Sequence, residues 1–362
     1  MQVDKFLPTP STDMTLCKQQ LSHGSRSFYF ASHLLPSVMQ HAACGLYAFC
    51  READDLVDEG ENPKRALELL HNRLDRIYEG KPQYVATDRV LTQIVHTYQM
   101  PRELLNALLE GFAWDAEGKL YHSIEDVYDY SARVAGAVGV MMSVLMGVRD
   151  ATTLARAADL GTAMQLTNIA RDVGEDAQLG RIYLPMDELK AEGVDTEQML
   201  ASPTYSEGVG VVTQRLLERA DWLYKRADYG ISQLPRKYQP GIRAARKLYA
   251  AIGQKVSEHG YNSVDQRAIV DTKKKFALLC SAIAFAQPRS KALDTPALPQ
   301  NQFLIDAVVA SGSVVPAIKS DPFKVRTLWI IDLFETLRER DRDARIASIR
   351  EAVENLTHPK WQ

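Results

Sequence analysis

The chain has 362 residues, of which 46% are hydrophobic and 25% charged, enough to bury the core of one large domain or of a domain with an appendage. Its formal net charge of −3 provides no overall attraction to nucleic acid, so a nucleic-acid partner is not expected. The four cysteines show no CxxC pair and no zinc-like spacing with histidine, which excludes a disulfide framework and favours a reduced, cytoplasmic environment.

Apolar residues recur at helical spacing along almost the whole chain, and strand-like alternation is scarce. We therefore predict an all-α fold. Its helices are expected at residues 37–59, 64–79, 86–98, 102–116, 124–148, 151–176, 206–233, 240–259 and 267–286. The longest apolar run, Val134 to Val148, is shorter than the roughly 18 residues that a membrane span needs, so it is expected to be a buried helix.

Segments at the start, in the middle and near the end of the chain depart from the regular helical pattern. The first residues show no basic region followed by an apolar run, so no secretory signal is expected. The segment Gly174 to Pro185 carries two glycines and a closing proline, which predicts a loop over a site. Three prolines between Pro288 and Asn301 indicate a linker, and the tail resumes with an amphipathic pattern around Val325 to Leu337. We therefore expect a catalytic domain (1–288), a Pro-rich linker (289–301) and a C-terminal helical extension (302–362).

Two predicted helices each carry a polar stripe with two aspartates. At about 100° per residue, one sector of roughly 60° contains Tyr47, Arg51, Asp54 and Asp58. A sector of about 80° on the second helix contains Gln165, Asn168, Asp172 and Asp176. Apolar residues adjoin both stripes, which is unusual for a solvated helix face.

Carboxylates four residues apart on one helix face repel each other, so a lone pair of this kind most often marks a solvated surface. Two such stripes, each with cationic or amide neighbours, instead favour a shared function. Mg²⁺ is a suitable metal ion for these stripes, because it takes one or two protein carboxylates as ligands and completes its coordination shell with water and phosphate oxygens. Mn²⁺ is the alternative metal. The stripes therefore predict metal ions held around a diphosphate group.

Several runs of residues then resemble a known family. They are HGSRSFYFA (23–31), YAFCREADDLVD (47–58), YSARVAGAVG (130–139), QLTNIARDVGEDAQLGRIYLP (165–185) and RKLYAAIG (246–253). Together they resemble the squalene/phytoene synthase family over about residues 15 to 288. The second aspartate run is most similar to the bacterial phytoene synthases of that family.

The resemblance implies an isoprenoid-synthase helical fold around a central cavity and a prenyltransferase activity. Two geranylgeranyl diphosphates would be condensed head to head to phytoene, for carotenoid biosynthesis, through a cyclopropylcarbinyl diphosphate intermediate and with release of diphosphate. This reaction ends in proton loss, so NADPH is not expected. The alternatives are a squalene or dehydrosqualene synthase that uses farnesyl diphosphate, and a non-catalytic relative that acts as an assembly protein.

The resemblance also implies roles for individual residues. Metal binding falls on Asp54, Asp58, Asp172 and Asp176. Catalytic positions near the diphosphate or the reacting carbons are Arg51, Tyr130, Arg171 and Tyr183. Substrate binding falls on Ser25, Ser27, Phe28, Arg51, Gln165, Asn168, Tyr249 and Arg267.

Two features leave alternatives open. Small residues between Val134 and Val148, including Gly136 and Gly139, would let a prenyl tail lie against the helix backbone, or would serve tight helix packing, and the two are compatible. The amphipathic tail is expected to pack on the catalytic core, with docking on a membrane surface or on a downstream pathway enzyme as the alternative. A cytoplasmic protein, with peripheral membrane association as the alternative, is the corresponding expectation.

Overall fold

The computed structural model describes residues 11–24, 29, 31–58, 62–283 and 295–312. Within these ranges all regular structure is helical and there is no strand, which confirms the all-α prediction. The helices are α1 (Ser11–Gly24), α3 (Ser37–Asp58), α4 (Pro63–Tyr78), α5 (Ala86–Tyr98), α6 (Arg102–Ala116), α7 (Ile124–Ser131), η1 (Ala132–Gly136), α8 (Ala137–Leu145), α9 (Ala151–Gln178), α10 (Met186–Ala191), α11 (Thr196–Ala201), α12 (Glu207–Gln233), α13 (Gln239–Glu258), α14 (Thr272–Ile283), η3 (Pro299–Asn301) and α15 (Gln302–Ala310).

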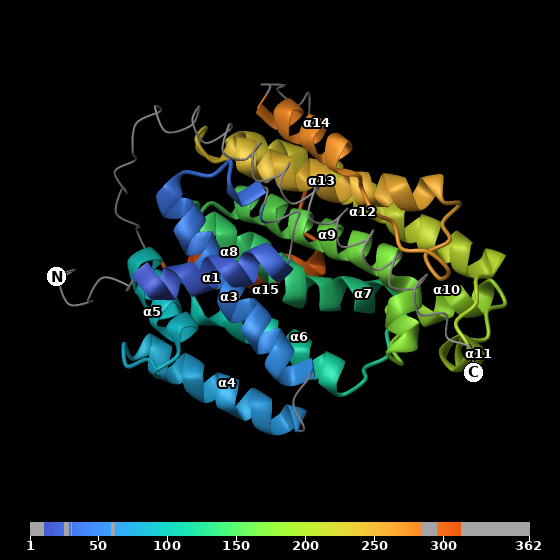
Figure 1. The fold of residues 1–362 in the computed structure, drawn as a ribbon, viewed down its shortest axis with the longest axis horizontal. Coiled ribbons are helices and arrows are strands. Elements are labelled where there is room, and N and C mark those ends of the chain that lie inside the picture. The colour runs from blue at the N-terminus through green and yellow to red at the C-terminus, as the bar shows by residue number, and fades with distance from the viewer. Residues whose placement is uncertain (1–10, 25–28, 30, 59–61, 284–294, 313–362) are drawn as a thin grey trace, which may run out of the picture.

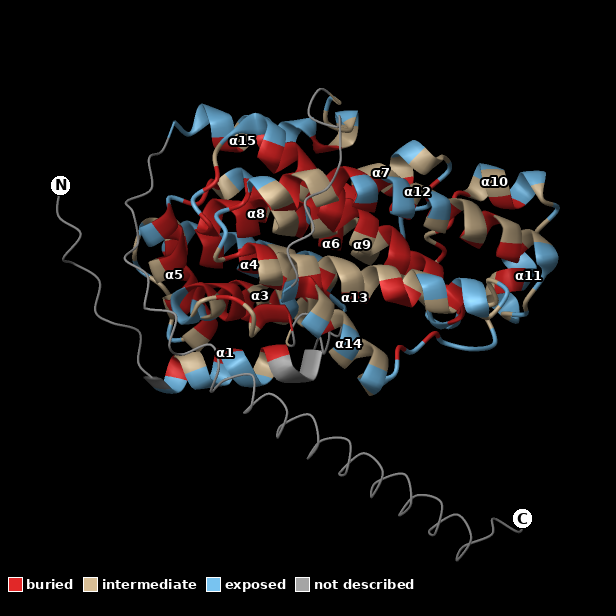
Figure 2. Cartoon of the chain, turned by 90° about the horizontal axis from the view of Figure 1, so that it is seen from above, coloured by how far each residue is buried: buried red, intermediate tan, exposed pale blue. Residues whose placement is uncertain are grey.

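Helix α9 is the central element of the fold (Figure 1). It packs against α12 and α13 on one side and against η1 and α8 on another. Its start is defined by Asp150, whose carboxylate accepts a hydrogen bond from the backbone N–H of Thr153 at 2.8 Å. Buried residues gather where α6, α8 and α9 meet, whereas α10, α11 and α14 expose much of their surface (Figure 2).

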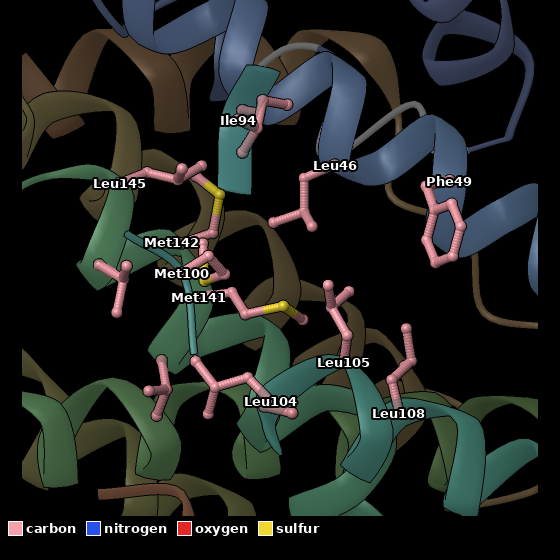
Figure 3. Packing of buried hydrophobic residues seen from close by; sticks show 14 of the residues in the cluster. Leu46, Phe49, Ile94, Met100, Leu104, Leu105, Leu108, Met141, Met142 and Leu145 are labelled. Carbon is pink, nitrogen blue, oxygen red and sulfur yellow. The ribbon is translucent and has the colours of Figure 1, made fainter. Parts of the chain in front are cut away.

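The largest hydrophobic core joins α1, α3, α5, α6 and α8, and a second core joins α9 with α12. In the first, Leu46 of α3 and Met142 of α8 share a buried cluster with Leu105 and Leu108 of α6, and Met141 extends toward Leu105 (Figure 3). Leu105 has no exposed surface, and Leu46, Leu108 and Met142 are exposed by 5% or less. Burial on this scale stabilises each side chain by roughly 1.5–3 kcal/mol, which holds α3 and α6 in a fixed relation to α8.

The predicted helix 124–148 is divided into α7, the π-helix η1 and α8. Two glycines account for the close approach of this segment to α9. A Cβ atom on Gly161 would lie 2.1 Å from the carbonyl oxygen of Ala135, and one on Gly139 would lie 2.3 Å from that of Ala157. Tight packing is therefore one role of Gly139. The π-helix η1, whose turns are wider than those of an α-helix, includes Ala135 and so lies at the contact with Gly161.

Two predicted boundaries were wrong. Helix α9 continues to Gln178, so the predicted loop Gly174–Pro185 begins only after it. Gly174 lies inside the helix, at a point where the backbone of the loop between α13 and α14 leaves no room for a side chain. Residues 267–271, predicted as helix, precede α14 instead.

The described part of the C-terminal region lies against the core. Leu304, Ile305 and Val308 of α15 are buried in the same cluster as α6 and α8. The amphipathic segment Val325–Leu337 lies outside the described residues, so the domain division stays a prediction. Among the helices that the structure describes, none has both the length and the apolar character needed to cross a membrane.

Candidate active site

A cavity of ≈ 390 Å³ lies between α3, α6, α8, α9 and α13. On α9 its lining includes Ala157, Gly161, Met164, Gln165 and Asn168, which recur at helical spacing. Much of the remaining wall is apolar. Leu46, Leu108 and Met142, which also belong to the core shown in Figure 3, contribute to it. The cavity therefore combines a long apolar interior with a polar end near the aspartates.

The first aspartate stripe borders this polar end from α3. Arg51 is paired with Asp54 at 3.0 Å and with Asp55 at 2.6 Å, and both Arg51 and Asp54 line the cavity. Asp58 is bound by Arg181, whose Nη2 lies 2.9 Å from its Oδ1. Arg181 follows α9 in the sequence, so this ion pair links the first stripe to the end of the second helix.

The second stripe lies on α9. Asp172 receives both Nε and Nη2 of Arg171, with Nε at 2.7 Å from Oδ1. Nε of Arg267 also donates to Asp172 at 3.0 Å, while its Nη1 lies 3.4 Å from Glu175. Two arginines thus converge on one aspartate, which lies one helical turn after the cavity-lining Asn168.

Asp115 of α6 is a functional candidate that the sequence interpretation missed. Its two carboxylate oxygens accept hydrogen bonds from the hydroxyl groups of Tyr130, at 2.8 Å, and Tyr183, at 2.7 Å. The rings of these tyrosines are stacked, with centroids 5.1 Å apart, and Tyr121 packs beside both. Asp115 and Tyr130 line the cavity, which brings a carboxylate between two of the predicted catalytic tyrosines.

A sequence model of the squalene/phytoene synthase family matches residues 21–274, more than half of the chain. The chain belongs to the squalene/phytoene synthase family. It is 44% identical over 347 residues to a phytoene synthase of Cereibacter sphaeroides, covering 92% of this chain and 95% of the relative. It is 48% identical over 303 residues to one of Rhodobacter capsulatus, covering 82% and 89%.

Solved structures of the family share the fold. A dehydrosqualene synthase in complex with ligand superposes with a TM-score of 0.70 at 31% identity, covering 75% of this chain and 95% of that one. The squalene synthase HpnC from Alicyclobacillus acidocaldarius gives 0.64 at 26% identity, covering 69% and 95%. The predicted isoprenoid-synthase fold is therefore confirmed.

The carboxylates of the two stripes lie in one electrostatic environment. Burial, reinforced by the neighbouring Asp58, raises the pKa of Asp54 to about 6. Burial together with Asp172 raises the pKa of Asp176 to about 7. Burial also raises the pKa of Asp115 to about 6, although the two tyrosine hydrogen bonds oppose this. Asp115 repels both Asp54 and Asp176, so it joins the two stripes of this family site into one acidic region.

The donor set of this acidic region fits a hard divalent cation. In the part of the chain that the structure describes, no three His, Cys, Asp or Glu side chains are grouped closely enough to enclose an ion by themselves. Mg²⁺ does not require such a cage, because it usually binds through one or two carboxylates and takes its other ligands from water and phosphate. The residues that would hold such ions are Asp54, Asp58, Asp172 and Asp176.

Most of the predicted site residues come together. Arg51, Asp54, Tyr130, Gln165, Asn168 and Tyr249 line the cavity. Arg171, Asp172 and Arg267 form one ion-paired group, and Tyr183 is bound to the cavity-lining Asp115. Ser25, Ser27 and Phe28 lie outside the described residues. The signal for Asp115 was present in the sequence, since it shares a helix face with the apolar Leu105, Leu108 and Phe112.

Proposed function

We propose that this chain is a phytoene synthase, a prenyltransferase that condenses two geranylgeranyl diphosphates head to head to phytoene and releases diphosphate. One observation carries the proposal: a single cavity combines an apolar interior with an end that both polar stripes line, through Arg51 and Asp54 of α3 and Gln165 and Asn168 of α9. The relatives at 44% and 48% identity bear the name phytoene synthase, which favours the 20-carbon substrate over the 15-carbon one.

The polar end accounts for ionisation of the substrate. When the allylic C–O bond breaks, negative charge develops on the departing diphosphate and must be stabilised. Arg51, Arg171 and Arg267 supply fixed positive charge beside the aspartates. Magnesium ions bound to the aspartates would stabilise the same charge as Lewis acids. Manganese is the alternative metal, and NADPH takes no part because the reaction ends with loss of a proton.

The interior accounts for protection of the carbocation that remains. Apolar side chains such as Leu108, Val138 and Met142 exclude water, which would otherwise capture the cation. Tyr130 borders the same space and is held by Asp115 through a 2.8 Å hydrogen bond. The carboxylate fixes the direction of the phenol and adds negative potential, so this pair would stabilise and orient the cation during the rearrangement.

The hydrocarbon product of this reaction has no polar group, so it must pass from the enzyme to a membrane or to another protein. We infer that the enzyme is cytoplasmic and associates peripherally with a membrane or a downstream pathway enzyme, through the C-terminal extension. Flotation with anionic liposomes, comparing the full chain with residues 1–312, tests this inference. Equal membrane binding of the two chains would exclude the extension as the anchor.

The function is tested by incubating the purified full chain with geranylgeranyl or farnesyl diphosphate and Mg²⁺, with and without NADPH, and identifying the hydrocarbons. We expect a 40-carbon product from geranylgeranyl diphosphate that requires no NADPH. A 30-carbon product from farnesyl diphosphate alone would establish the squalene or dehydrosqualene alternative.

Asp54→Ala and Asp172→Ala serve as controls, which should abolish the product with little change in helical circular dichroism. Full activity in either would contradict the metal site. No product from the wild type with either diphosphate would instead support the assembly-protein alternative.

A further inference from the structure

The loop between α13 and α14, residues 259–271, is built to keep a fixed shape. Gly260 and Tyr261 both adopt left-handed backbone conformations, with φ of 65° and 59°. The side-chain oxygen of Asn262 then accepts hydrogen bonds from the backbone N–H groups of Val264, at 3.2 Å, and Asp265, at 3.0 Å. Tyr205 of the chain segment before α12 donates its hydroxyl to the carbonyl of Gly260 at 3.2 Å.

This loop rests on the backbone of α9 at Gly174. The N–H of Gly174 donates to the carbonyl of Ser263 at 2.9 Å. A Cβ atom at position 174 would lie 2.2 Å from the carbonyl oxygen of Val264 and 2.8 Å from its Cα. Both are backbone atoms, so the loop could not give way by rotating a side chain. Glycine in a helix interior is destabilising relative to alanine, and this contact is a reason for its presence.

Gly174 is not among the residues that line the cavity, and its contact with the loop lies on a different face of α9 from Asp172. At about 100° per residue, Gly174 is about 160° from Asp172 around the helix, and Glu175 lies between them, about 60° from Asp172. Arg267 leaves the same loop and follows this path, with Nη1 at 3.4 Å from Glu175 and Nε at 3.0 Å from Asp172. The loop therefore contacts α9 at Gly174 and places the guanidinium group of Arg267 around the helix, beside Asp172.

We propose that Gly174 is a positioning residue: the absence of a side chain there allows the 259–271 loop to dock, and the docked loop places Arg267 where it binds the diphosphate. The proposal deepens the proposed function and rests on it for the identity of the ligand. Gly174 itself touches neither the cavity nor the reacting groups, because its contacts are with the backbone of Ser263 and Val264.

The test compares Gly174→Ala, Arg267→Gln and the double variant in the full-length chain. Binding of inorganic diphosphate in the presence of Mg²⁺ is measured by calorimetry, and hydrogen exchange of the 259–271 loop by mass spectrometry. We expect each single variant to bind diphosphate roughly tenfold more weakly, the loss typical of one charge-assisted contact. The double variant should bind no more weakly than Arg267→Gln, and only the two variants that carry Gly174→Ala should exchange faster in the loop.

Gly253→Ala is the matched control, because a Cβ atom there would meet only the side-chain carbons of Leu217 and Thr167, at 3.0 and 3.7 Å. It should behave as the wild type in both measurements. Wild-type affinity in Gly174→Ala or in Arg267→Gln would overturn the proposal, as would a double variant weakened by the product of the two single effects. If Gly174→Ala does not fold, Asn262→Ala must give the same result by loosening the loop from within, and unchanged affinity there overturns the proposal too.

The two proposals fail in different ways. A wild-type chain that binds diphosphate through Arg267 but forms no 40-carbon product would refute the proposed substrate and leave the positioning role intact. A chain that makes phytoene, with the loop exchanging at the same rate in the wild type and in Gly174→Ala, would refute the positioning role alone.

Discussion

Asp115 is a buried carboxylate whose two oxygens are both occupied by tyrosine hydroxyl groups. Replacing it by asparagine leaves one oxygen to accept from two donors and turns an N–H₂ group toward one of them. We expect Asp115→Asn to lower kcat by about 10²–10³-fold, since loss of one preorganised electrostatic group costs on this scale. Steady-state kinetics with geranylgeranyl diphosphate measure the effect. Asp221→Asn, at an exposed ion pair with Lys225, is the control and should retain full activity.

Asp176 should reduce the stability of the metal-free protein at neutral pH. Its pKa is about 7 in the fold against an ordinary value of 3.8, so the folded chain binds its proton more tightly than the unfolded chain. The contribution of Asp176 to the free energy of unfolding is therefore fully present below about pH 4, and it is lost as the pH rises toward 7. The coupling with Asp172 makes about 1–2 kcal/mol a reasonable estimate of the loss.

Asp176→Asn should accordingly raise the Tm of the metal-free protein at pH 8 by ~1–3 °C while abolishing product formation. At pH 4 the variant and the wild type should unfold at the same temperature. Thermal scans in EDTA across this pH range provide the measurement. A variant less stable than the wild type at pH 8 would show that Asp176 is held by favourable contacts instead.

At the scale of single residues, the sequence predicted the charged side chains of the site but not their long-range ion-pair partners. Helical spacing put Arg51 beside Asp54, because that pair is local. The pairing of Asp58 with Arg181 joins residues 123 positions apart, and that of Asp172 with Arg267 spans 95. Such contacts depend on how helices and loops meet, which periodicity within one helix does not report.

Helix α9 contacts the segment before α8 through backbone atoms, and Gly161 makes this possible. In Gly161→Ala the new Cβ would lie 2.1 Å from the carbonyl oxygen of Ala135. We expect a loss of at least about 1–3 kcal/mol in the free energy of unfolding, because neither backbone can move without displacing η1. Urea denaturation followed by circular dichroism measures it. Gly253→Ala should cost nothing comparable, and equal stability of the two variants would contradict the packing role.

The contact between Gly161 and Ala135 lies within the segment that was predicted as one helix and that the structure divides into α7, η1 and α8. Residues 124–148 carry a continuous helical pattern, and nothing in their composition marks a π-turn. The π-helix lies where Ala135 meets Gly161 of α9, a tertiary contact that the pattern within residues 124–148 does not report. Helix α9 itself was predicted within two residues of its observed end, because its periodicity is strong and its cap, Asp150, is local.

At the scale of the molecule, residues 295–312 behave as part of the catalytic core. The carbonyl of Pro296 accepts hydrogen bonds from the buried Arg156, at 3.2 Å, and from Arg226, at 2.7 Å. Three buried apolar residues of α15 add roughly 4–9 kcal/mol of burial, a large share of a typical folding free energy. The predicted boundary at residue 288 is therefore best tested by truncation.

A chain ending at residue 294 should aggregate or melt far below the full-length protein, whereas one ending at residue 312 should keep its fold and activity. Size-exclusion chromatography and thermal scans of the two chains distinguish these outcomes. A folded and active 1–294 chain would instead support the division into a catalytic domain and an independent extension.

The length of the cavity along α9 offers a test of substrate choice by the whole molecule. Ala157 lines the apolar interior and lies 11 residues from Asn168, or about 16 Å along the helix. A phenylalanine at position 157 should shorten the cavity from its far end, so that the longer substrate is excluded first. We expect Ala157→Phe to raise the ratio of kcat/KM for farnesyl over geranylgeranyl diphosphate by about tenfold or more. Ala157→Ser, which barely changes the volume, should leave the ratio unaltered. An equal loss with both substrates would mean that the prenyl chain does not reach this part of α9.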